Sequence, residues 1–404
     1  MPRFLIIVAA VLMACVAAPA LAADRPLTIL ISIDGFRADY LDRGVTPVLS
    51  GLAATGTRGV MRPSFPTKTF PNHYTLVSGL RPDRNGIVEN NMEDPAIPGV
   101  SFRMSNSEAV TDRRWWDQAE PLWVRAERAG IVTATMFWPG SEAPIRGVRP
   151  RYWRPFDQSV SSDARVDQVL TWIDLPKADR PAFVTLYFDL VDTVGHNAGP
   201  DSLELNAALD VVDQALGRLT TGLKARGLAA NLVVVADHGM AAMSEDRTIY
   251  MDDYLPKAAY RSLTGGVFMT IYPAKGRKAE VLKALRRPHP HLQCWEKAKI
   301  PARFHYGKNP RVAPVFCLAD VGWRVTTRDF KATRIERGAH GFDNFSPEMA
   351  AIFVANGPDI KPGMVLPAFD NVDVYPLLAR LIGVKPARTD GSLRPVKAAL
   401  QAFR

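Results

Sequence analysis

Five continuous apolar runs, separated by segments with helical periodicity, most limit what this chain of 404 residues can fold into. Each run is rich in β-branched or aromatic residues and short, which predicts a buried strand. Strands that are apolar on both faces are typical of an α/β fold, with a mostly parallel sheet covered by helices on both faces. The predicted strands are 27–33, 131–138, 182–190, 232–236 and 349–355, and the predicted helices are 47–55, 120–129, 163–173, 202–225 and 372–382.

The segment from about 250 to 335 departs from this alternation. It is rich in Pro, Gly, Lys and aromatic residues, and the strands that it predicts, 267–272 and 322–326, are short. We therefore expect an inserted α+β cap subdomain within a single catalytic domain that spans 23–404.

The N-terminus has the pattern of a signal peptide. Arg3 precedes an apolar stretch, 4–16, which is followed by the small-residue cleavage pattern Ala20-Leu21-Ala22. We expect residues 1–22 to be removed and the remaining chain, which has no transmembrane segment, to be periplasmic or secreted. Cys15 lies in a sequence that loosely resembles a lipoprotein box, so lipid anchoring is the alternative.

Cysteine content and charge restrict the function further. Outside the predicted signal the chain has two cysteines, Cys294 and Cys317, which in an oxidising compartment predict one intrachain disulfide, with a free pair as the alternative. So few thiols exclude a sulfur-based metal site. The formal net charge of +9 is spread along the chain without a dense basic block, which favours a small anionic substrate and no specific nucleic-acid partner.

Acidic residues and a histidine follow three of the predicted strands. Asp34 follows the first strand, Asp189 and Asp192 follow the third, and Asp237 and His238 follow the fourth. Ligands in open α/β sheets bind beyond the carboxyl ends of the strands, so we expect these side chains to share one site.

Two more histidines complete the pattern: His196 stands four residues after Asp192, and His340 lies in a Gly-containing loop before the last strand. Each pattern alone has a simpler explanation, such as a helix cap, an Asp-Gly turn or a surface histidine. Together they supply carboxylates and imidazoles, the ligands that zinc prefers where thiols are absent. Three Asp and three His suit two ions, which clamp the attacking and leaving oxygens of a phosphoryl displacement.

Thr69 has two compatible interpretations. It precedes Phe70-Pro71 and an apolar helical run, which is typical of a helix N-cap. Beside a divalent ion its hydroxyl would also become an activated nucleophile. A helix N-terminus offers free N–H groups to a phosphate, so both roles point to the same chemistry.

Five motifs in order carry a resemblance. They are SIDGFRADYL at 32–41, PTKTFPNHYTLVSGLRPDRNGIVENNM at 66–92, VDTVGHNAGP at 191–200, VVVADHGM at 233–240 and GAHGFDN at 338–344. As a set they resemble the nucleotide pyrophosphatase/phosphodiesterase family of the alkaline phosphatase superfamily, in its bacterial exported form.

The resemblance implies an alkaline-phosphatase-like fold with two Zn²⁺ per chain, and hydrolysis of nucleotide phosphodiester and pyrophosphate bonds that releases nucleoside 5'-monophosphates. Thr69 would be the nucleophile and would form a covalent intermediate, and Asn90 would bind a phosphate oxygen. Phe70 and Tyr187 would flank the nucleobase. Matched position by position, one zinc would be held by Asp192, His196 and His340, and the other by Asp34, Thr69, Asp237 and His238.

Other functions are compatible with the same motifs. Phosphonates, phospholipid-type diesters and phosphate monoesters are alternative substrates, and a non-catalytic metal- or nucleotide-binding protein is the alternative of another class. No Arg occupies a motif position that would clamp the phosphate oxygens, which suits a singly charged diester better than a dianionic monoester. Lys68 remains open as a phosphate-steering or an exposed residue, and we interpret His73 as packing or hydrogen-bonding beneath the helix.

Overall fold

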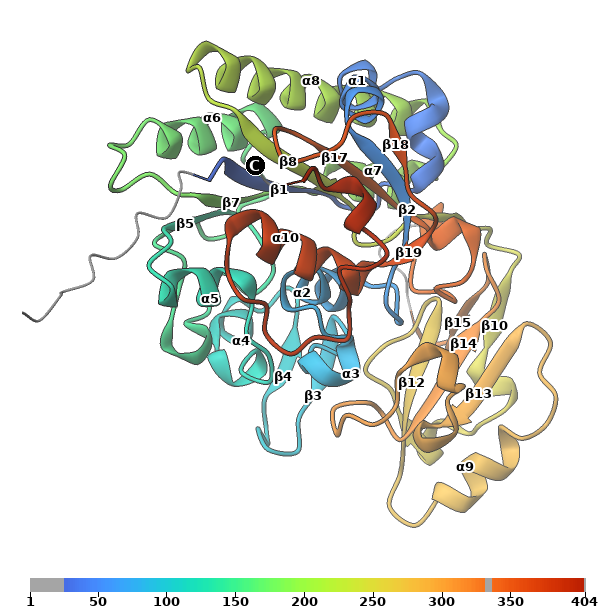
Figure 1. Cartoon of the computed structure of the whole chain (residues 1–404). Coiled ribbons are helices and arrows are strands. Elements are labelled where there is room, and N and C mark those ends of the chain that lie inside the picture. Colours follow the sequence, from blue (N-terminus) through green and yellow to red (C-terminus); the bar gives the residue numbers. More distant parts are fainter. Residues whose placement is uncertain (1–24, 331–335, 403–404) are drawn as a thin grey trace, which may run out of the picture.

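A nine-stranded mixed sheet forms the centre of the molecule (Figure 1). The computed structural model describes residues 25–330 and 336–402, so the predicted signal peptide, 1–22, and Cys15 lie outside the described residues. The strand order is β18–β2–β17–β8–β1–β7–β5–β6, and β19 also pairs with β2. The strands are β1 Leu27–Ile33, β2 Thr57–Arg62, β5 Thr133–Met136, β6 Tyr152–Trp153, β7 Phe183–Phe188, β8 Ala230–Val235, β17 Ala351–Asn356, β18 Met364–Val365 and β19 Phe369–Asp370.

The predicted, mostly parallel sheet is confirmed. Five adjacent strands, β8, β1, β7, β5 and β6, run parallel to one another. The strand β17 is antiparallel to both of its neighbours, β8 and β2. Because β2 is reversed twice relative to β8, its carboxyl end lies at the same edge of the sheet as those of β8, β1 and β7.

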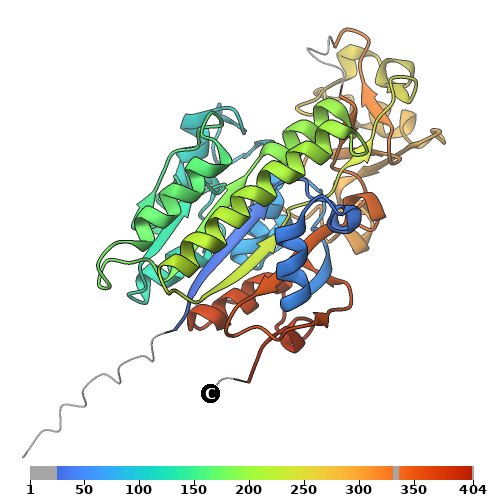
Figure 2. The same ribbon diagram turned by 90° about the horizontal axis from the view of Figure 1, so that it is seen from above.

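Helices cover both faces of the sheet, as Figures 1 and 2 show. One face carries α1 (Pro47–Thr55), α6 (Ser162–Ile173) and the long α8 (Leu203–Ala225). The other face carries α2 (Thr69–Ser78), α5 (Leu122–Arg128) and α10 (Val374–Ile382). Short helices are α3 Pro82–Asn85, α4 Ser107–Thr111, α7 Leu190–Ala198 and α9 Lys278–Ala284, and no described helix is both long and apolar enough to cross a bilayer.

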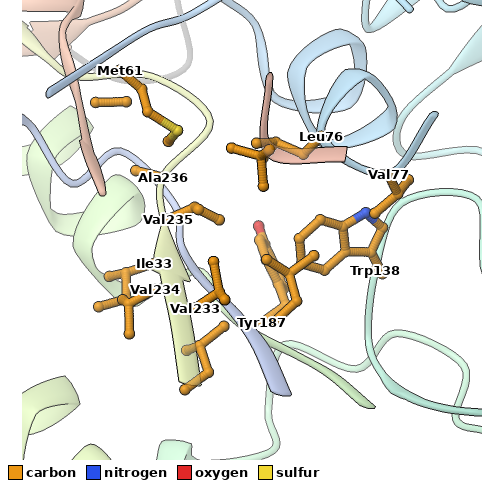
Figure 3. Packing of buried hydrophobic residues seen from close by; sticks show 14 of the residues in the cluster. Ile33, Met61, Leu76, Val77, Trp138, Tyr187, Val233, Val234, Val235 and Ala236 are labelled. Atoms are coloured by element: carbon orange, nitrogen blue, oxygen red, sulfur yellow. The ribbon is translucent and has the colours of Figure 1, made fainter. Parts of the chain in front are cut away.

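Apolar periodicity explains how these helices pack. In α8 the hydroxyl of Ser202 caps the helix by accepting the N–H of Leu205, and the leucines at 205, 209, 216, 219 and 223 are buried in the core. In α2 the side chains of Leu76 and Val77 join the valines of β8 in the same core, as Figure 3 shows. This packing sets the N-terminus of α2 at the carboxyl edge of the sheet.

The segment predicted as a cap subdomain has a sheet and a small core of its own. The sheet is antiparallel in the order β11–β12–β14–β13, and its core includes Met251, Ile271 and Val281. Cys294 on β13 faces Cys317 on β14, and the predicted disulfide between them is present. The strands of this sheet are β11 Tyr260–Arg261, β12 Phe268–Pro273, β13 Leu292–Glu296 and β14 Val315–Ala319. A separate parallel pair consists of β10 Thr248–Tyr250 and β15 Arg324–Thr326.

A buried ion pair ties this segment to the main sheet unit. Arg311, only 3% exposed, donates from Nε to Asp94 at 2.6 Å. Its other nitrogens donate to the backbone carbonyls of Gly86, Trp115 and Arg114. A guanidinium whose donors are met in this way fixes the position of the segment that carries it.

We predict that Arg311→Met destabilises the protein by about 3–5 kcal/mol, because it leaves Asp94 buried without its charge partner. The measurement is the guanidinium unfolding midpoint. Adding Asp94→Leu to the variant should recover part of the loss. The exposed pair Arg218–Asp167 supplies the control, since Arg218→Ala removes a solvated ion pair and should leave the midpoint unchanged.

Candidate active site

The three strands that precede the predicted acidic ligands are neighbours in the sheet. The strand β1 pairs in parallel with β7 on one side and with β8 on the other. Asp34, Asp192 and Asp237 follow these strands and therefore meet at one edge. The predicted gathering of carboxylates thus follows directly from the sheet topology.

Glycines allow the loops at this edge to approach closely. Gly35 has a φ of +69°, and a Cβ there would lie 3.1 Å from Cα and Cβ of Asp192. Its N–H donates to Asp237 Oδ1 at 3.2 Å. At Gly239 a Cβ would lie 2.2 Å from the carbonyl oxygen of Glu348, so this glycine serves close packing of the backbone.

Asp192 and His196 lie on one face of α7, four residues apart. His340 lies in the loop that enters β17. Because β17 runs antiparallel to β8, its amino end lies at the edge where the carboxyl ends of the parallel strands meet. The loop thereby brings His340 next to His238, and the two rings stack with centroids 3.5 Å apart.

All three predicted ligand histidines are oriented in the same way. The Nδ1 atoms of His196, His238 and His340 lie 2.8–2.9 Å from the carbonyl oxygens of Gly338, Gly239 and Thr67, respectively. A carbonyl only accepts, so each Nδ1 carries the hydrogen, and the neutral form of each ring presents a bare Nε2. This arrangement is typical of imidazoles that bind a metal through Nε2.

Each bare Nε2 faces a carboxylate oxygen that lacks a hydrogen-bond donor. The buried atoms Asp34 Oδ1, Asp192 Oδ1 and Asp237 Oδ2 have no hydrogen-bond partner in the described structure. His238 Nε2 lies 2.8 Å from Asp237 Oδ2 and 3.5 Å from Asp34 Oδ1. Asp192 Oδ1 lies 3.5 Å from His196 Nε2 and 3.6 Å from His340 Nε2. Acceptors that face acceptors fit a cation between them.

The pKa values reflect this crowding of charge. Burial raises the pKa of Asp34 well above its usual value, and the charges of Asp237 and Asp192 raise it further. Burial also opposes the charge of Asp237, but its attraction to the groups around it, His238 foremost, outweighs burial and lowers the pKa of Asp237 to about 2, and Asp237 in turn raises the pKa of His238 against the opposing effect of burial. Burial and the neighbouring His238 lower the pKa of His340, which favours its neutral, ligating form.

Thr69 is the first residue of α2 and not its N-cap. Lys68 has the extended cap conformation, and no side chain caps the helix. The Thr69 hydroxyl instead lies 3.4 Å from His238 Nε2, and the side chain is buried, with the residue 7% exposed. The hydroxyl therefore belongs to the carboxylate–imidazole cluster, beside the free N–H groups of the helix N-terminus.

Comparison with known proteins agrees with this geometry. The model of a family described as type I phosphodiesterase/nucleotide pyrophosphatase matches residues 28–343, most of the chain. The chain belongs to the type I phosphodiesterase/nucleotide pyrophosphatase family. The resemblance to this family inferred from the five motifs is confirmed, and so is the prediction of an enzyme of this class, while its bacterial exported form stays a prediction.

Individual relatives extend the match. An uncharacterised pyrophosphatase/phosphodiesterase of Schizosaccharomyces pombe is 38% identical over 90% of this chain and 78% of its own length. Ectonucleotide pyrophosphatase/phosphodiesterase family member 3 of Rattus norvegicus is 37% identical over 91% of this chain, but the chain spans only 43% of that protein. An inactive threonine-to-alanine variant of murine ectonucleotide pyrophosphatase/phosphodiesterase 5, in complex with AMP, superposes with a TM-score of 0.89 at 35% identity, covering 93% of this chain and 100% of that one.

In this phosphodiesterase-family chain, Asn90 lies against the start of α2. Its side-chain Oδ1 accepts the N–H of Phe70 at 3.0 Å. This contact uses Oδ1 and leaves the amide NH₂ as the donating half of the side chain. Asn90 therefore contacts the residue that follows Thr69, and its role as a donor to a phosphate oxygen stays a prediction.

Tyr187 has a contact that the sequence did not suggest. Its hydroxyl donates to Asp34 Oδ2 at 2.7 Å, which fixes the carboxylate and leaves Oδ1 unpaired. Figure 3 shows the Tyr187 ring beside the Trp138 indole, and both rings contact His73 edge-on. Tyr187 therefore positions a candidate metal ligand, in addition to any contact with a nucleobase.

A pocket of about 440 Å³ opens beside this cluster. Phe70 and Tyr187 line it together with Asp34, Asp192 and Thr69. None of the described residues that line it is Lys or Arg. The pocket thus combines aromatic walls with an acidic floor.

Phe156 also lines the pocket, and no sequence pattern indicated it because it stands in a Pro-containing loop. It is 48% exposed, and the Glu142 carboxylate fixes it by accepting its backbone N–H at 3.1 Å.

Arg165 was also missed. This buried residue pairs with Asp189 at 2.6 Å, so Asp189 already has a charge partner. Burial of an Arg in an amphipathic helix cannot be read from periodicity alone.

We predict that Tyr187→Phe weakens divalent-ion binding about 10- to 100-fold, because the hydrogen bond that orients Asp34 is lost. The measurement is titration of metal-free protein with zinc against a chelating dye. Tyr40→Phe is the matched control, since the buried Tyr40 hydroxyl has no hydrogen-bond partner in the described structure. Equal affinities for the two variants would contradict the positioning role of Tyr187.

Proposed function

We propose that this chain is a zinc-dependent hydrolase that cleaves nucleotide phosphodiester and pyrophosphate bonds through a covalent threonine intermediate, releasing nucleoside 5'-monophosphates. One observation carries the proposal: the Thr69 hydroxyl lies at a helix N-terminus, 3.4 Å from His238 Nε2, among carboxylate oxygens that lack donors. The inactive threonine-to-alanine variant of the murine relative, which holds AMP, supports both the nucleophile and the product.

The donor set supports two divalent ions, for which we propose zinc. When bound, the ions would lower the pKa of a coordinated hydroxyl and stabilise the charge that develops on the attacking and leaving oxygens. Oxygen and imidazole ligands without thiols suit this choice. We propose that one ion is held by Asp192, His196 and His340, and the other by Asp34, Thr69, Asp237 and His238.

The reaction would have two in-line steps. Thr69 Oγ1 forms a bond to phosphorus while the bond from phosphorus to the leaving oxygen breaks, which transfers the nucleotidyl group to Thr69. Water then attacks phosphorus from the vacated side, and the Thr69–phosphorus bond breaks to release the nucleoside monophosphate. The Asn90 amide and the backbone N–H of Thr69 would donate to the equatorial oxygens in both steps.

The charge of the pocket supports a diester as substrate. A phosphate diester carries one negative charge, while a monoester carries two and needs additional cationic donors. Lys68 lies close enough to His340 for its charge to lower the pKa of that histidine, but it is not among the described residues that line the pocket. Phosphate monoesters should therefore be the poorer substrates.

We also propose that residues 1–22 are a signal peptide, that the chain is exported to the periplasm or secreted, and that the segment at about 250–335 is a cap subdomain. The disulfide Cys294–Cys317 supports an oxidising compartment. The separate sheet and core of the inserted segment support its treatment as a subdomain.

We predict that Thr69→Ala lowers kcat on p-nitrophenyl-TMP by on the order of 10³-fold or more, while metal content stays the same, because the nucleophile is removed and the charged ligands remain. Thr69→Ser keeps a hydroxyl and should retain measurable turnover. The assay also compares p-nitrophenyl-TMP with p-nitrophenyl phosphate. Near-full activity of the Ala variant would reject Thr69, and a monoester preference would reject the proposed substrate class.

We predict that Phe156→Ala raises KM for p-nitrophenyl-TMP with little change in kcat, because stacking on a base contributes about 1–3 kcal/mol of binding. Methyl p-nitrophenyl phosphate, whose retained group has no ring, is the control substrate and should show no change. An equal rise in KM for both substrates would mean that Phe156 shapes the pocket in general and does not stack on the base.

A further inference from the structure

His73 is a buried histidine that the proposed mechanism does not use. It lies on α2, one helical turn after Thr69, and none of its surface is exposed. A fully buried imidazole needs partners for both ring nitrogens, and those partners lie in the catalytic cluster.

The two hydrogen bonds of His73 determine its tautomer. Nδ1 lies 2.9 Å from the carbonyl oxygen of Thr69, which only accepts, so Nδ1 carries the hydrogen. Nε2 lies 2.8 Å from the hydroxyl of Ser32 on β1, which therefore donates to it.

His73 also connects the parts of the site that must stay in register. Its Nδ1 lies 3.5 Å from Asp237 Oδ2, and its ring meets the rings of Trp138 and Tyr187 edge-on. Its backbone carbonyl accepts the indole N–H of Trp138 at 3.1 Å. Through these contacts a single side chain touches β1, the nucleophile's peptide unit and a ligand carboxylate.

An alternative role is that of a metal ligand. Ligand atoms of Asp34, His73 and Asp237 all lie within 4.8 Å of one another, as in a three-residue metal site. Both nitrogens of His73 are already engaged, however, by the Thr69 carbonyl and the Ser32 hydroxyl. The ring thus has no free lone pair for a cation, unlike the rings of His196, His238 and His340.

We propose that His73, held in one tautomer by Ser32, is a positioning residue that fixes the carbonyl of Thr69 and thereby aims the Thr69 hydroxyl at phosphorus. The inference rests on the proposed role of Thr69 as nucleophile. A hydrogen bond to the nucleophile's own peptide unit restrains the rotation of that unit, and near-attack geometry depends on displacements below 1 Å.

Two amide substitutions separate the two nitrogens of the ring. In His73→Asn the amide can place a donor near the Nδ1 position and keep the bond to Thr69. In His73→Gln the amide reaches toward Ser32 and leaves the Thr69 carbonyl without its side-chain donor. On p-nitrophenyl-TMP we expect kcat to fall about 100-fold in the Gln variant and less than about tenfold in the Asn variant. KM and the number of zinc ions per chain should not change in either.

Equal kcat values for the two variants would overturn the inference, and loss of a metal ion from the Gln variant would identify His73 as a ligand.

Ser32→Ala provides an independent test should neither variant fold. This substitution removes the hydroxyl that donates to Nε2, so that either ring nitrogen of His73 can carry the hydrogen. It should lower kcat about tenfold at constant KM. Thr28→Val is its control, because Thr28 is buried on the same strand and its hydroxyl has no hydrogen-bond partner in the described structure; equal kcat values for these two variants would also overturn the inference. Thr69→Ala separates the two proposals: if it retains turnover, the proposed function itself fails.

Discussion

The confinement of three carboxylates, Asp34, Asp192 and Asp237, at one edge of a sheet is the constraint on which the rest of the site depends. Each has an oxygen without a donor, and burial and mutual repulsion raise the pKa of Asp34 well above its usual value. Such a cluster is costly unless positive charge balances it. The carboxylates lie together because the parallel strands β8, β1 and β7 are neighbours and end at the same edge of the sheet. The hydrogen bond from Tyr187 offsets part of the repulsion at Asp34.

The histidines are oriented so that one ring nitrogen of each faces the carboxylates. Each of the three rings is hydrogen-bonded to a backbone carbonyl through Nδ1, which directs Nε2 toward the cluster. Had carboxylates taken the places of those carbonyls, they would have favoured the cationic form of the rings more strongly. The backbone carbonyls of Thr67, Gly239 and Gly338 therefore orient the candidate metal ligands.

The sequence predicted the parts of this structure that depend on continuous apolar strands. The buried runs in β1, β7 and β8 are found within two residues of their expected ends, and the acids that follow them meet as expected. The strand β2 was missed, because only two of its six residues are buried and the others include Gly59 and two arginines. The run at 131–138 is a strand only from Thr133 to Met136, because Phe137 turns the chain with a φ of +60°.

Contacts between residues that are far apart in the sequence could not be predicted, because they depend on how the helices and strands pack together. A sequence motif places Thr69 and His73 on one helix, but only the packing of α2 on the sheet brings Ser32 to His73. The pocket shows the same limit, since its exposed aromatic wall comes from a loop that has no periodicity. None of the described residues that line the pocket is Lys or Arg, so attraction of a phosphate would depend on the divalent ions that we propose. Affinity for an anionic substrate should therefore rise and fall with metal occupancy, while the net charge of +9 acts only at long range.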